Sequence, residues 1–449
     1  MIFLYQLVVQ PILFVLTHLF WLLLPKKLRD SIKLKWQSLA HIQNVKAFVA
    51  NNPTNSILIH AASGEIECAK PLISELLQRG YKVLVTHSSP SLKHIFHNKH
   101  PRLLVQPLPF DFFFLQKKFL LSNKVSHIFI AKTDLWPNLL LAARSLSIPS
   151  YLFAVHLPSY SFSFQLNPLS RWWKSFLFTQ FTKIFVVDEQ DRQVLTKIFN
   201  ISPNQIEVVG DTRYDQVAIR IQLERQKNQR LLPPKEQGFR LILGSTWRAD
   251  EQFWLPILPE LLEKGLVKQI IICPHEPTTS CLKDLEQSLA SLQITFCRLS
   301  QVDTSIDSHK NGYQVILIDR IGILAALYLE CDVAFVGGSF EGKVHSVLEP
   351  LAAGLPTAVG PYHLNSREAI LFSQIPCHNE SNFPLVVTPI SSKQHAVEWL
   401  LSFQKKDILK IKQNIGNIIA NKKGATQRLL HQLSFLGEDA TTRIPNSIN

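Results

Sequence analysis

The sequence predicts an α/β protein with two doubly wound, Rossmann-like domains facing a cleft, preceded by a hydrophobic, membrane-associated helix. Three observations lead to this expectation. Short apolar strands alternate with amphipathic helical stretches along most of the chain, which is typical of parallel sheets with helices on both faces. The chain has 449 residues, too many for one hydrophobic core. A charged stretch with a double proline, Pro233–Pro234, separates two such alternations.

Composition favours a packed protein with reduced cysteines. Hydrophobic residues make up 46% of the chain, which argues against disorder. The six cysteines are scattered and none forms a CxxC pair, so we expect neither a disulfide framework nor a zinc site. The formal net charge of +13 favours an anionic partner, either nucleic acid or an anionic membrane surface.

Residues 1–30 are predicted to form a membrane anchor. The first 24 residues are apolar with few exceptions, namely Gln6, Gln10, Thr17 and His18. A basic group follows at once, with Lys26, Lys27 and Arg29. The stretch is long enough to span a bilayer; a helix in the membrane interface and a buried helix of a soluble domain are the alternatives. The basic flank predicts that the remaining chain is cytoplasmic.

Residues 31–225 are predicted to form the first domain. Its strands are expected at Ile57–His60, Val83–Thr86, His127–Ala131, Tyr151–Val155, Ile184–Val187 and Glu207–Val209. Ligands of such sheets bind beyond the carboxyl ends of the strands. The loops that follow these strands are therefore the candidates for chemistry.

Residues 226–238 are predicted to link the first domain to a second, at 239–403. Strands of the second domain are expected at Leu241–Leu243, Gln269–Cys273, Ile294–Cys297, Val315–Ile318, Val333–Val336, Thr357–Val359 and Leu385–Val387. Residues 404–435 have helical periodicity and many lysines, and residues 436–449 are expected to be a disordered tail.

Three loops of the first domain carry charged residues. Glu65 lies near the start of a helix, where it could take a proton from a hydroxyl group or simply complement the helix dipole. Lys132 and Asp134 follow the third predicted strand and could form an ordinary structural ion pair. Arg213, in the segment GDTRYD, is suited to a phosphate or a carboxylate.

The segment from Gly337 to Glu349 is a glycine-rich turn leading into a short helix. Its backbone N–H groups could converge on an anion, with Glu349 holding a sugar hydroxyl. Alternatively, Ser346 and Glu349 could form a capping box at the helix start. Three other loops of the second domain also follow strands at the same edge of the predicted sheet. They carry the segments GSTW, CPHEP and DRIG. The first of these could be an anion nest or an ordinary hydroxyl cap.

These motifs together resemble a known family. The ordered set HAASGE, DLWPN, GDTRYD, GSTW, CPHEP, DRIGILAALY, FVGGSFEGKVHSVLEP and GPYHLNSREA resembles the 3-deoxy-D-manno-octulosonic acid (Kdo) transferases of lipid A synthesis, membrane-anchored glycosyltransferases of the GT-B architecture. The resemblance implies inverting transfer of Kdo from CMP-Kdo to a lipid A precursor, lipid IVA, without a metal or another cofactor. It also implies a position at the cytoplasmic face of the inner membrane, held by the N-terminal segment.

The resemblance implies a role for particular residues. Glu65 matches the family's general base, and Arg213 matches a cation that steadies the leaving nucleotide. Glu349 would hold the ribose, and backbone N–H groups near Ser346 would face the phosphate. The implied contacts with the CMP donor are Pro274, His275, Ile321, Gly322, Ile323, Ser346, Val347, Leu348 and Glu349.

The chain departs from the family pattern at several positions in these loops. One residue fewer separates the serine and glycine of the first motif, so Glu65 could be displaced. The other departures are Lys132 for an acid, His156 and His275 for arginines, and Ser346 for an asparagine. They keep open a GT-B transferase that uses another nucleotide sugar or another lipid. A nucleic-acid-binding protein is less favoured, because the aromatic run Pro109–Leu115 is not interleaved with arginines.

Overall fold

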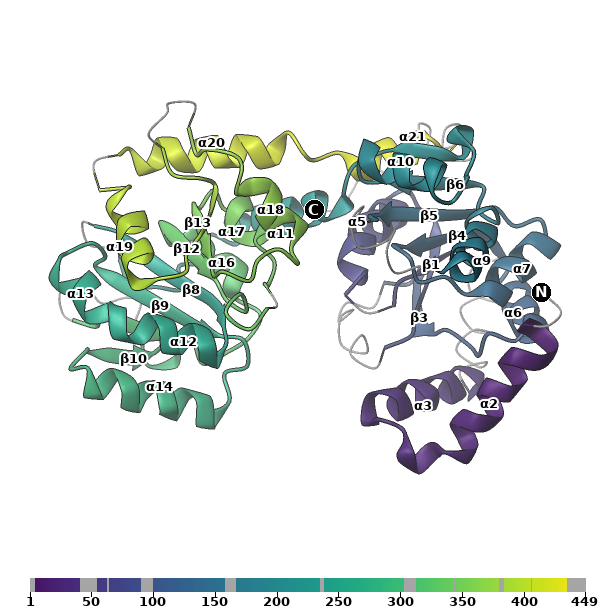
Figure 1. The fold of residues 1–449 in the computed structure, drawn as a ribbon, viewed down its shortest axis with the longest axis horizontal. Coiled ribbons are helices and arrows are strands. Elements are labelled where there is room, and N and C mark those ends of the chain that lie inside the picture. The colour runs from purple at the N-terminus through teal and green to yellow at the C-terminus, as the bar shows by residue number, and fades with distance from the viewer. Residues whose placement is uncertain are drawn as a thin grey trace. The chain divides into compact units, whose positions relative to one another are not determined.

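The computed structural model divides into two compact units. It describes residues 5–40, 55–62, 64–89, 100–157, 167–234, 238–302, 312–342, 344–378, 383–404 and 406–433. Unit 1 comprises residues 1–216 and 423–449, and unit 2 comprises residues 217–422. Each unit has its own parallel sheet (Figure 1). The expected doubly wound α/β class is therefore confirmed for both parts of the chain.

The sheet of unit 1 has the strand order β3-β2-β1-β4-β5-β6-β7, with every neighbouring pair parallel. The strands are β1 (Ser56–His60), β2 (Lys82–His87), β3 (Leu103–Pro107), β4 (Val125–Ala131), β5 (Ser150–Val155), β6 (Lys183–Val186) and β7 (Ile206–Val208). Six of them match the expected strands, and β3 is an addition at the edge of the sheet. The order reverses direction between β1 and β4, the position at which such sheets bind ligands.

Helices cover both faces of this sheet. They are α5 (Ile66–Gln78), α6 (Phe113–Ser122), α7 (Pro137–Ser145), α9 (Pro168–Phe178), α10 (Glu189–Lys197) and α21 (Ala425–His431), with a short 3₁₀ helix η4 (Pro203–Gln205). Leu72 of α5 and Leu429 of α21 share one buried cluster with Ile59 of β1. Leu120 of α6 and Leu139 of α7 share the other cluster with Leu58. The alternation of neighbouring β1 side chains between two cores explains why this strand is buried throughout.

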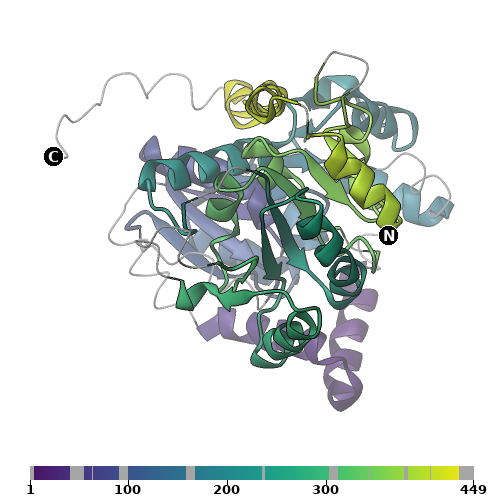
Figure 2. The same ribbon diagram turned by 90° about the vertical axis from the view of Figure 1, so that its left-hand side faces the viewer.

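The N-terminal apolar stretch does not form one long helix. A π-helical turn η1 (Tyr5–Val9) leads into α2 (Gln10–Leu19), followed by a 3₁₀ turn η2 (Trp21–Leu23) and α3 (Lys26–Ala40). Among the residues that the structure describes, no helix is both long and apolar enough to cross a membrane. The expectation of a spanning anchor is thus unsupported: the helix ends at Phe20, and Pro25 precedes a second, basic helix. Figures 1 and 2 show the resulting hairpin in purple.

Unit 2 repeats the same architecture with the strand order β10-β11-β9-β8-β12-β13-β14, also parallel. The strands are β8 (Arg240–Thr246), β9 (Gln269–Pro274), β10 (Phe296–Arg298), β11 (Val315–Leu317), β12 (Val333–Val336), β13 (Thr357–Val359) and β14 (Val387–Pro389). All seven overlap the expected strands. Here the order reverses between β8 and β12.

The helices of unit 2 again lie on both faces of its sheet. They are α12 (Arg248–Trp254), α13 (Leu258–Glu263), α14 (Thr279–Ser291), α16 (Leu324–Leu329), α17 (Leu348–Ala352), α18 (Arg367–Phe372), α19 (Lys393–Leu401) and α20 (Ile408–Ala420), with 3₁₀ turns η5 (Leu255–Ile257) and η6 (Leu299–Gln301). Tyr328 of α16 packs with Ile242 and Ile271 in one buried cluster. Side chains of α12, α13 and α14, including Trp254, Leu261 and Leu285, are buried as well.

The chain passes from unit 1 to unit 2 inside a helix. Helix α11 (Thr212–Lys227) contains the boundary between Gln216 and Val217, whereas the sequence suggested a linker at 226–238. Of that segment, 235–237 lie outside the described residues, and Leu232 is fully buried in unit 2. The chain returns to unit 1 at Lys423, so the expected C-terminal helical segment is shared: α20 belongs to unit 2 and α21 to unit 1. The expected disordered tail, 436–449, lies outside the described residues.

Candidate functional site

In unit 1, the loops that carry Glu65 and Lys132 follow β1 and β4, the two strands at which the sheet order reverses. Glu65 occupies the cap position of α5 and makes no side-chain bond to the first turn of that helix. Pro71 lies inside α5 and does not end it. Ser63, the serine of the first motif HAASGE, lies outside the described residues. The expected candidates are therefore at the ligand-binding edge of this sheet.

The candidate charges of unit 1 gather around one buried thiol. Burial raises the pKa of Cys68 to about 12, with further contributions that raise it from Asp211 and Glu65 and contributions that lower it from Lys132 and Arg213. These four charged residues come from three different loops. Because a charge acts on a pKa only at short range, the structure brings Glu65, Lys132 and Arg213 to one region.

Arg213 is held in place by a carboxylate. Its guanidinium donates to both carboxylate oxygens of Asp211, from Nη2 at 2.6 Å and from Nε at 3.0 and 3.2 Å. Asp211 is 3% exposed, and the neighbouring Thr212 hydroxyl donates to the backbone oxygen of Cys68 at 2.7 Å. The GDTRYD loop is thus fastened to the first turns of α5, which follow Glu65.

Asp134 pairs with a histidine. Its carboxylate lies 2.8 Å from His60 Nε2 and accepts the indole N–H of Trp136 at 3.1 Å. Burial alone would raise the pKa of Asp134, but the His60 and Trp136 contacts and the charge of Lys35 bring it below its ordinary value. His156, where the family has an arginine, contacts Asp191 Oδ1 at 3.0 Å. Asp134 is therefore engaged in a buried network at the end of β1.

In unit 2, the glycine-rich turn after β12 already holds an anion from the protein itself. Asp250 of α12 is fully buried, and its carboxylate accepts the backbone N–H of Gly338 at 2.7 Å and of Trp247 at 2.8 Å. Gly337 has no room for a side chain, since a Cβ atom would lie 2.3 Å from the Ser245 backbone oxygen. The close approach explains this glycine. The turn that the sequence suggested as an anion nest is thus filled by Asp250.

Most of the expected donor contacts line one small pocket of about 100 Å³. They follow two different strands, β9 and β11. The pocket contains Pro274, His275, Ile321, Gly322 and Ile323, together with Arg320 and Ser245. Arg320 is exposed, as is Ile321 at 78%. The structure therefore brings together the CPHEP and DRIG segments and adds a cation to them.

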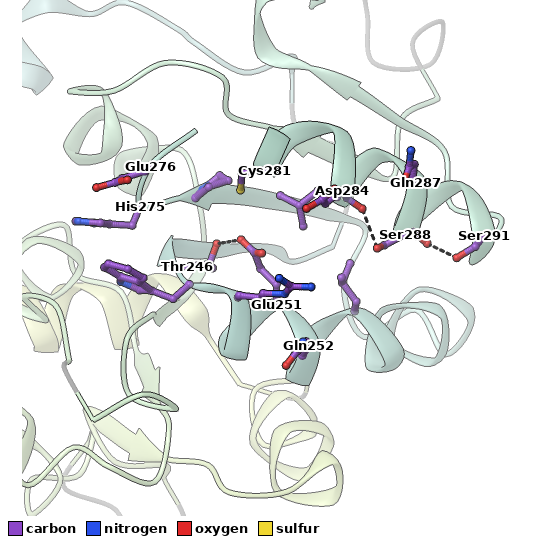
Figure 3. A pocket seen from close by; sticks show the side chains of 15 residues that line it. Thr246, Glu251, Gln252, His275, Glu276, Cys281, Asp284, Gln287, Ser288 and Ser291 are labelled. Carbon is purple, nitrogen blue, oxygen red and sulfur yellow. Dashed lines mark hydrogen bonds between the residues drawn. The ribbon is translucent and has the colours of Figure 1, made fainter. Parts of the chain in front are cut away.

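A larger pocket of about 630 Å³ lies between α12 and α14 and shares Pro274 and His275 with the smaller one. Its charged lining comprises three carboxylates and one cation, namely Glu251, Glu276, Asp284 and Arg248. Figure 3 shows Glu251 and Asp284 on opposite sides of it, with the Thr246 hydroxyl 2.9 Å from Glu251. Burial raises the pKa of Glu251. This excess of carboxylates disfavours a phosphate.

Three aromatic rings stack where the two pockets meet. The His275 ring lies 4.8 Å from the Trp247 ring and 4.3 Å from the His345 ring, measured between ring centroids. The Trp247 indole N–H donates to His345 Nε2 at 2.7 Å. Burial, with a smaller contribution from His275, lowers the pKa of His345 to about 4. His345 is therefore neutral at physiological pH and can accept this hydrogen bond.

Glu349 contacts an arginine and does not complete a capping box. Helix α17 begins after Val347, and Ser346 Oγ accepts only a weak bond from the Leu348 N–H at 3.3 Å. The Glu349 carboxylate instead accepts a bond from Arg220 Nη1 at 2.5 Å. The capping-box alternative is therefore wrong. Ser346, Val347, Leu348 and Glu349 do not line the small pocket, but they follow His345, which stacks on its rim residue His275.

Sequence reasoning did not identify Asp250, Arg220 or Trp247 as partners of the candidate residues. Their positions within helical or strand-to-helix segments gave no sign of these long-range contacts. The described residues include no group of three or more histidine, cysteine, aspartate or glutamate side chains arranged to hold a metal.

Comparisons with known proteins agree with the motifs. Residues 36–216 match the family model described as "3-Deoxy-D-manno-octulosonic-acid transferase (kdotransferase)". The 3-deoxy-D-manno-octulosonic acid transferase of Chlamydia pneumoniae is 27% identical over 323 residues, 70% of this chain and 71% of the relative. That of Haemophilus influenzae is 25% identical over 397 residues, 85% of this chain and 87% of the relative. The resemblance to this family is confirmed.

The fold also has counterparts among solved structures. The UDP-GlcNAc 2-epimerase of Neisseria meningitidis, solved with UDP-GlcNAc, superposes with a TM-score of 0.57 at 15% identity, covering 85% of this chain and 99% of that protein. At this identity the likeness concerns the fold alone. It agrees with two Rossmann-like units of the GT-B kind.

Proposed function

We propose that this chain, a glycosyltransferase similar to the Kdo transferases, transfers Kdo from CMP-Kdo to a lipid A precursor, lipid IVA. The observation that carries the proposal is the similarity to one such transferase over 397 residues, an extent that must include parts of both units. The convergence of Glu65, Lys132 and Arg213 around Cys68 supports it. Composition alone favoured an anionic partner, and both proposed substrates are anionic.

In the proposed mechanism, Glu65 is the general base. Its carboxylate takes the proton of an acceptor hydroxyl, whose oxygen forms a bond to the anomeric carbon of Kdo. The bond from that carbon to the CMP phosphate breaks, and its electron pair leaves with CMP. Attack opposite the leaving group inverts the anomeric carbon. Proton removal by a positioned carboxylate accelerates a reaction of this kind by roughly 10²- to 10⁴-fold. The proposed mechanism uses neither a metal nor another cofactor.

Arg213 supplies positive charge at the same edge of unit 1. Nε and Nη2 both donate to Oδ2 of Asp211, which fixes the orientation of the guanidinium, and a guanidinium has five N–H donors in a fixed plane. We assign Arg213 to steadying the charge that develops as CMP leaves. The pair with Asp211 restrains the arginine before substrate arrives, which lowers the entropic cost of using it.

The donor nucleotide is assigned to the small pocket of unit 2. Charge supports this choice, because Arg320 lines the small pocket while the large one carries three carboxylates and one arginine. CMP-Kdo bears a phosphodiester and a carboxylate, so the larger, acidic pocket would repel it. Glu349 is assigned to the ribose hydroxyls, with Arg220 setting the direction of its carboxylate.

The membrane position is also a proposal. The hairpin of α2 and α3 exposes large apolar side chains, with Leu19, Leu22 and Leu23 exposed by 71%, 84% and 80%. The basic residues Lys26 and Arg29 begin α3 next to them. An apolar face flanked by cations is typical of a helix that lies in the interface of an anionic membrane. We therefore propose that this hairpin binds the cytoplasmic face of the inner membrane.

The proposal is tested by incubating the purified protein with CMP-Kdo and the tetra-acylated lipid A precursor. We expect the mass of the lipid to increase by one or more Kdo units, and we expect Glu65→Ala to abolish this change with the protein still folded. An unchanged lipid mass with the wild-type protein would contradict the assigned substrates.

A second candidate is a transferase of the same fold that uses another nucleotide sugar. The observation that favours it is the His275 ring, stacked between Trp247 and His345 at a position where the family has an arginine. Thermal unfolding in the presence of CMP, UDP or GDP separates the two candidates. Stronger stabilisation by UDP than by CMP would favour the second.

A further inference from the structure

The N-terminal hairpin, defined here as residues 5–40, makes polar contacts with the start of α7. The Gln6 amide donates to the side-chain oxygen of Asn138 at 2.7 Å, and the Asn138 amide donates to that of Gln10 at 2.7 Å. The Tyr5 hydroxyl donates to the Asp111 carboxylate at 3.4 Å. Asp111 in turn accepts the backbone N–H of Asn138 at 3.1 Å. The hairpin thus reaches the helix that directly follows the β4–α7 loop.

One cation of the hairpin lies against that loop. Lys35 Nζ of α3 is 3.7 Å from the centroid of the Trp136 ring, within the range of a cation–π interaction. Burial lowers the pKa of Lys35 to about 8, although the charges of Asp111 and Asp134 raise it. Lysine side chains are rarely buried to this extent. The position of Lys35 is therefore a specific contact.

Trp136 connects this cation to the end of β1. Its indole N–H lies 3.0 Å from His60 Nε2 and 3.1 Å from Asp134 Oδ2. The other ring nitrogen of His60, Nδ1, lies 3.0 Å from the Thr86 hydroxyl at the end of β2. His60 is the last residue of β1, and the chain then enters the loop that ends at Glu65. A continuous set of contacts thus runs from Lys35 to the end of β1, the strand that precedes the loop with the proposed base.

The aromatic run PFDFFF forms a second contact surface for the hairpin. The Phe14 ring of α2 meets Phe110 and Phe112 edge to face, at centroid distances of 5.2 and 5.3 Å. Trp36 of α3 packs against Phe110 at 5.2 Å. Leu22 and Leu23, in the turn between α2 and α3, are exposed. The hairpin therefore packs on the rest of unit 1 through aromatic side chains, while its connecting turn exposes apolar side chains.

We propose that Lys35 is a positioning residue. Through its contact with Trp136, it couples the position of the N-terminal hairpin to the positions of Asp134 and His60 at the catalytic edge of unit 1. The segment expected to be only an anchor is then part of the support of the active site. The effect of Lys35 on turnover rests on the function proposed above; its effect on the loop does not.

Hydrogen–deuterium exchange of the substrate-free protein tests the structural step. Lys35→Met keeps the length of the side chain and removes its charge. We expect amides of the β4–α7 loop and the first turn of α7 to exchange roughly 3- to 30-fold faster, the range that a cation–π contact supports. Lys35→Arg should retain protection, because a guanidinium also binds the face of an indole. Lys33→Met is the matched control, since Lys33 is exposed on the same helix.

Equal exchange in Lys35→Met and Lys33→Met would overturn the proposal. Should Lys35→Met prevent folding, Trp136→Phe provides an independent test, because phenylalanine keeps a ring for the cation and lacks the N–H that contacts His60 and Asp134. We expect that variant to loosen the loop while the hairpin stays protected. Loss of protection in the hairpin and the loop to the same extent would show general unfolding and contradict a directed path.

Kinetics with CMP-Kdo and a deacylated, water-soluble acceptor test the catalytic step. We expect Lys35→Met to lower kcat with little change in KM for the donor, which binds unit 2 in our assignment. A change in donor KM alone would contradict a positioning role in unit 1. If the wild-type protein turns over neither this acceptor nor lipid IVA while the exchange result holds, the function proposed above fails and the positioning role of Lys35 stands.

Discussion

The ligand-binding edges of the two units share a topology but use different chemistry. In unit 1, Arg213 forms an ion pair with Asp211 within one loop, and His60 contacts Asp134 of another loop. In unit 2, two pockets meet at a stack of three rings, and the glycine turn encloses Asp250. The comparison teaches that one fold can hold reactive charges in fixed positions at one edge and offer a shaped surface at the other. Proton transfer suits the first and nucleotide binding the second.

The largest expected effect separates the two edges by function. Glu65→Gln should lower kcat by roughly 10²- to 10⁴-fold, because an amide cannot take a proton. Binding of CMP, measured by calorimetry, should stay the same since CMP is assigned to unit 2. Glu67→Gln is the control: Glu67 lies two residues further on and pairs with Lys70. Equal losses in the two variants would remove the assignment of Glu65.

The next prediction concerns the carboxylate that fills the glycine turn of unit 2. Asp250→Ala should destabilise the protein by about 2–4 kcal/mol, because the backbone N–H groups of Gly338 and Trp247 lose their acceptor. The thermal midpoint of unfolding measures this. Asp250→Asn retains one side-chain oxygen and should cost less. If alanine and asparagine variants unfold at the wild-type temperature, the turn does not depend on Asp250 and could accept an external anion.

Glu349 tests whether nucleotide binding belongs to unit 2. Glu349→Gln should weaken CMP binding by roughly 10- to 100-fold, the range for hydrogen bonds to a charged group, with calorimetry as the measurement. Glu341→Gln, in the same β12–α17 connection and exposed, should bind CMP normally. Unchanged affinity in Glu349→Gln would show that its carboxylate serves Arg220 alone.

The smallest predicted effect is a pH dependence confined to unit 1. Lys35 has a pKa of about 8, lowered by burial, while Asp111 and Asp134 favour its charged form. The cation over Trp136 is therefore present below pH 8 and lost as the pH rises through it. Exchange of the β4–α7 loop, corrected for intrinsic rates, should accelerate roughly 3-fold or more between pH 7 and 9. Lys35→Arg should abolish this step, whereas a step that persists would have another origin.

Local pattern was enough to predict most of the fold. Apolar runs bounded by turn residues located all but one strand, because strand formation follows from neighbouring side chains. The exception is β3 (Leu103–Pro107). A further apolar stretch follows it, so the sequence pattern did not mark where this strand ends. The sequence did not predict the helical hairpin, because the apolar stretch at its N-terminus was read as a single hydrophobic helix. Gln6, Gln10 and His18, which interrupt the apolar stretch, bind Asn138, the backbone of Asp111 and Trp36 in the structure.

The sequence by itself therefore determined the two α/β alternations, the motif-bearing loops and the family that they resemble. Only the tertiary structure decided which side chains meet: Asp250 in the glycine turn, Arg220 on Glu349, and Lys35 on Trp136. The tertiary structure also decided where the chain crosses between the units, which is inside α11 and not at a linker at 226–238. The physical reason is the separation along the sequence of the residues that interact. Secondary structure depends on residues a few positions apart, whereas these contacts join residues that only strand order and helix packing bring together.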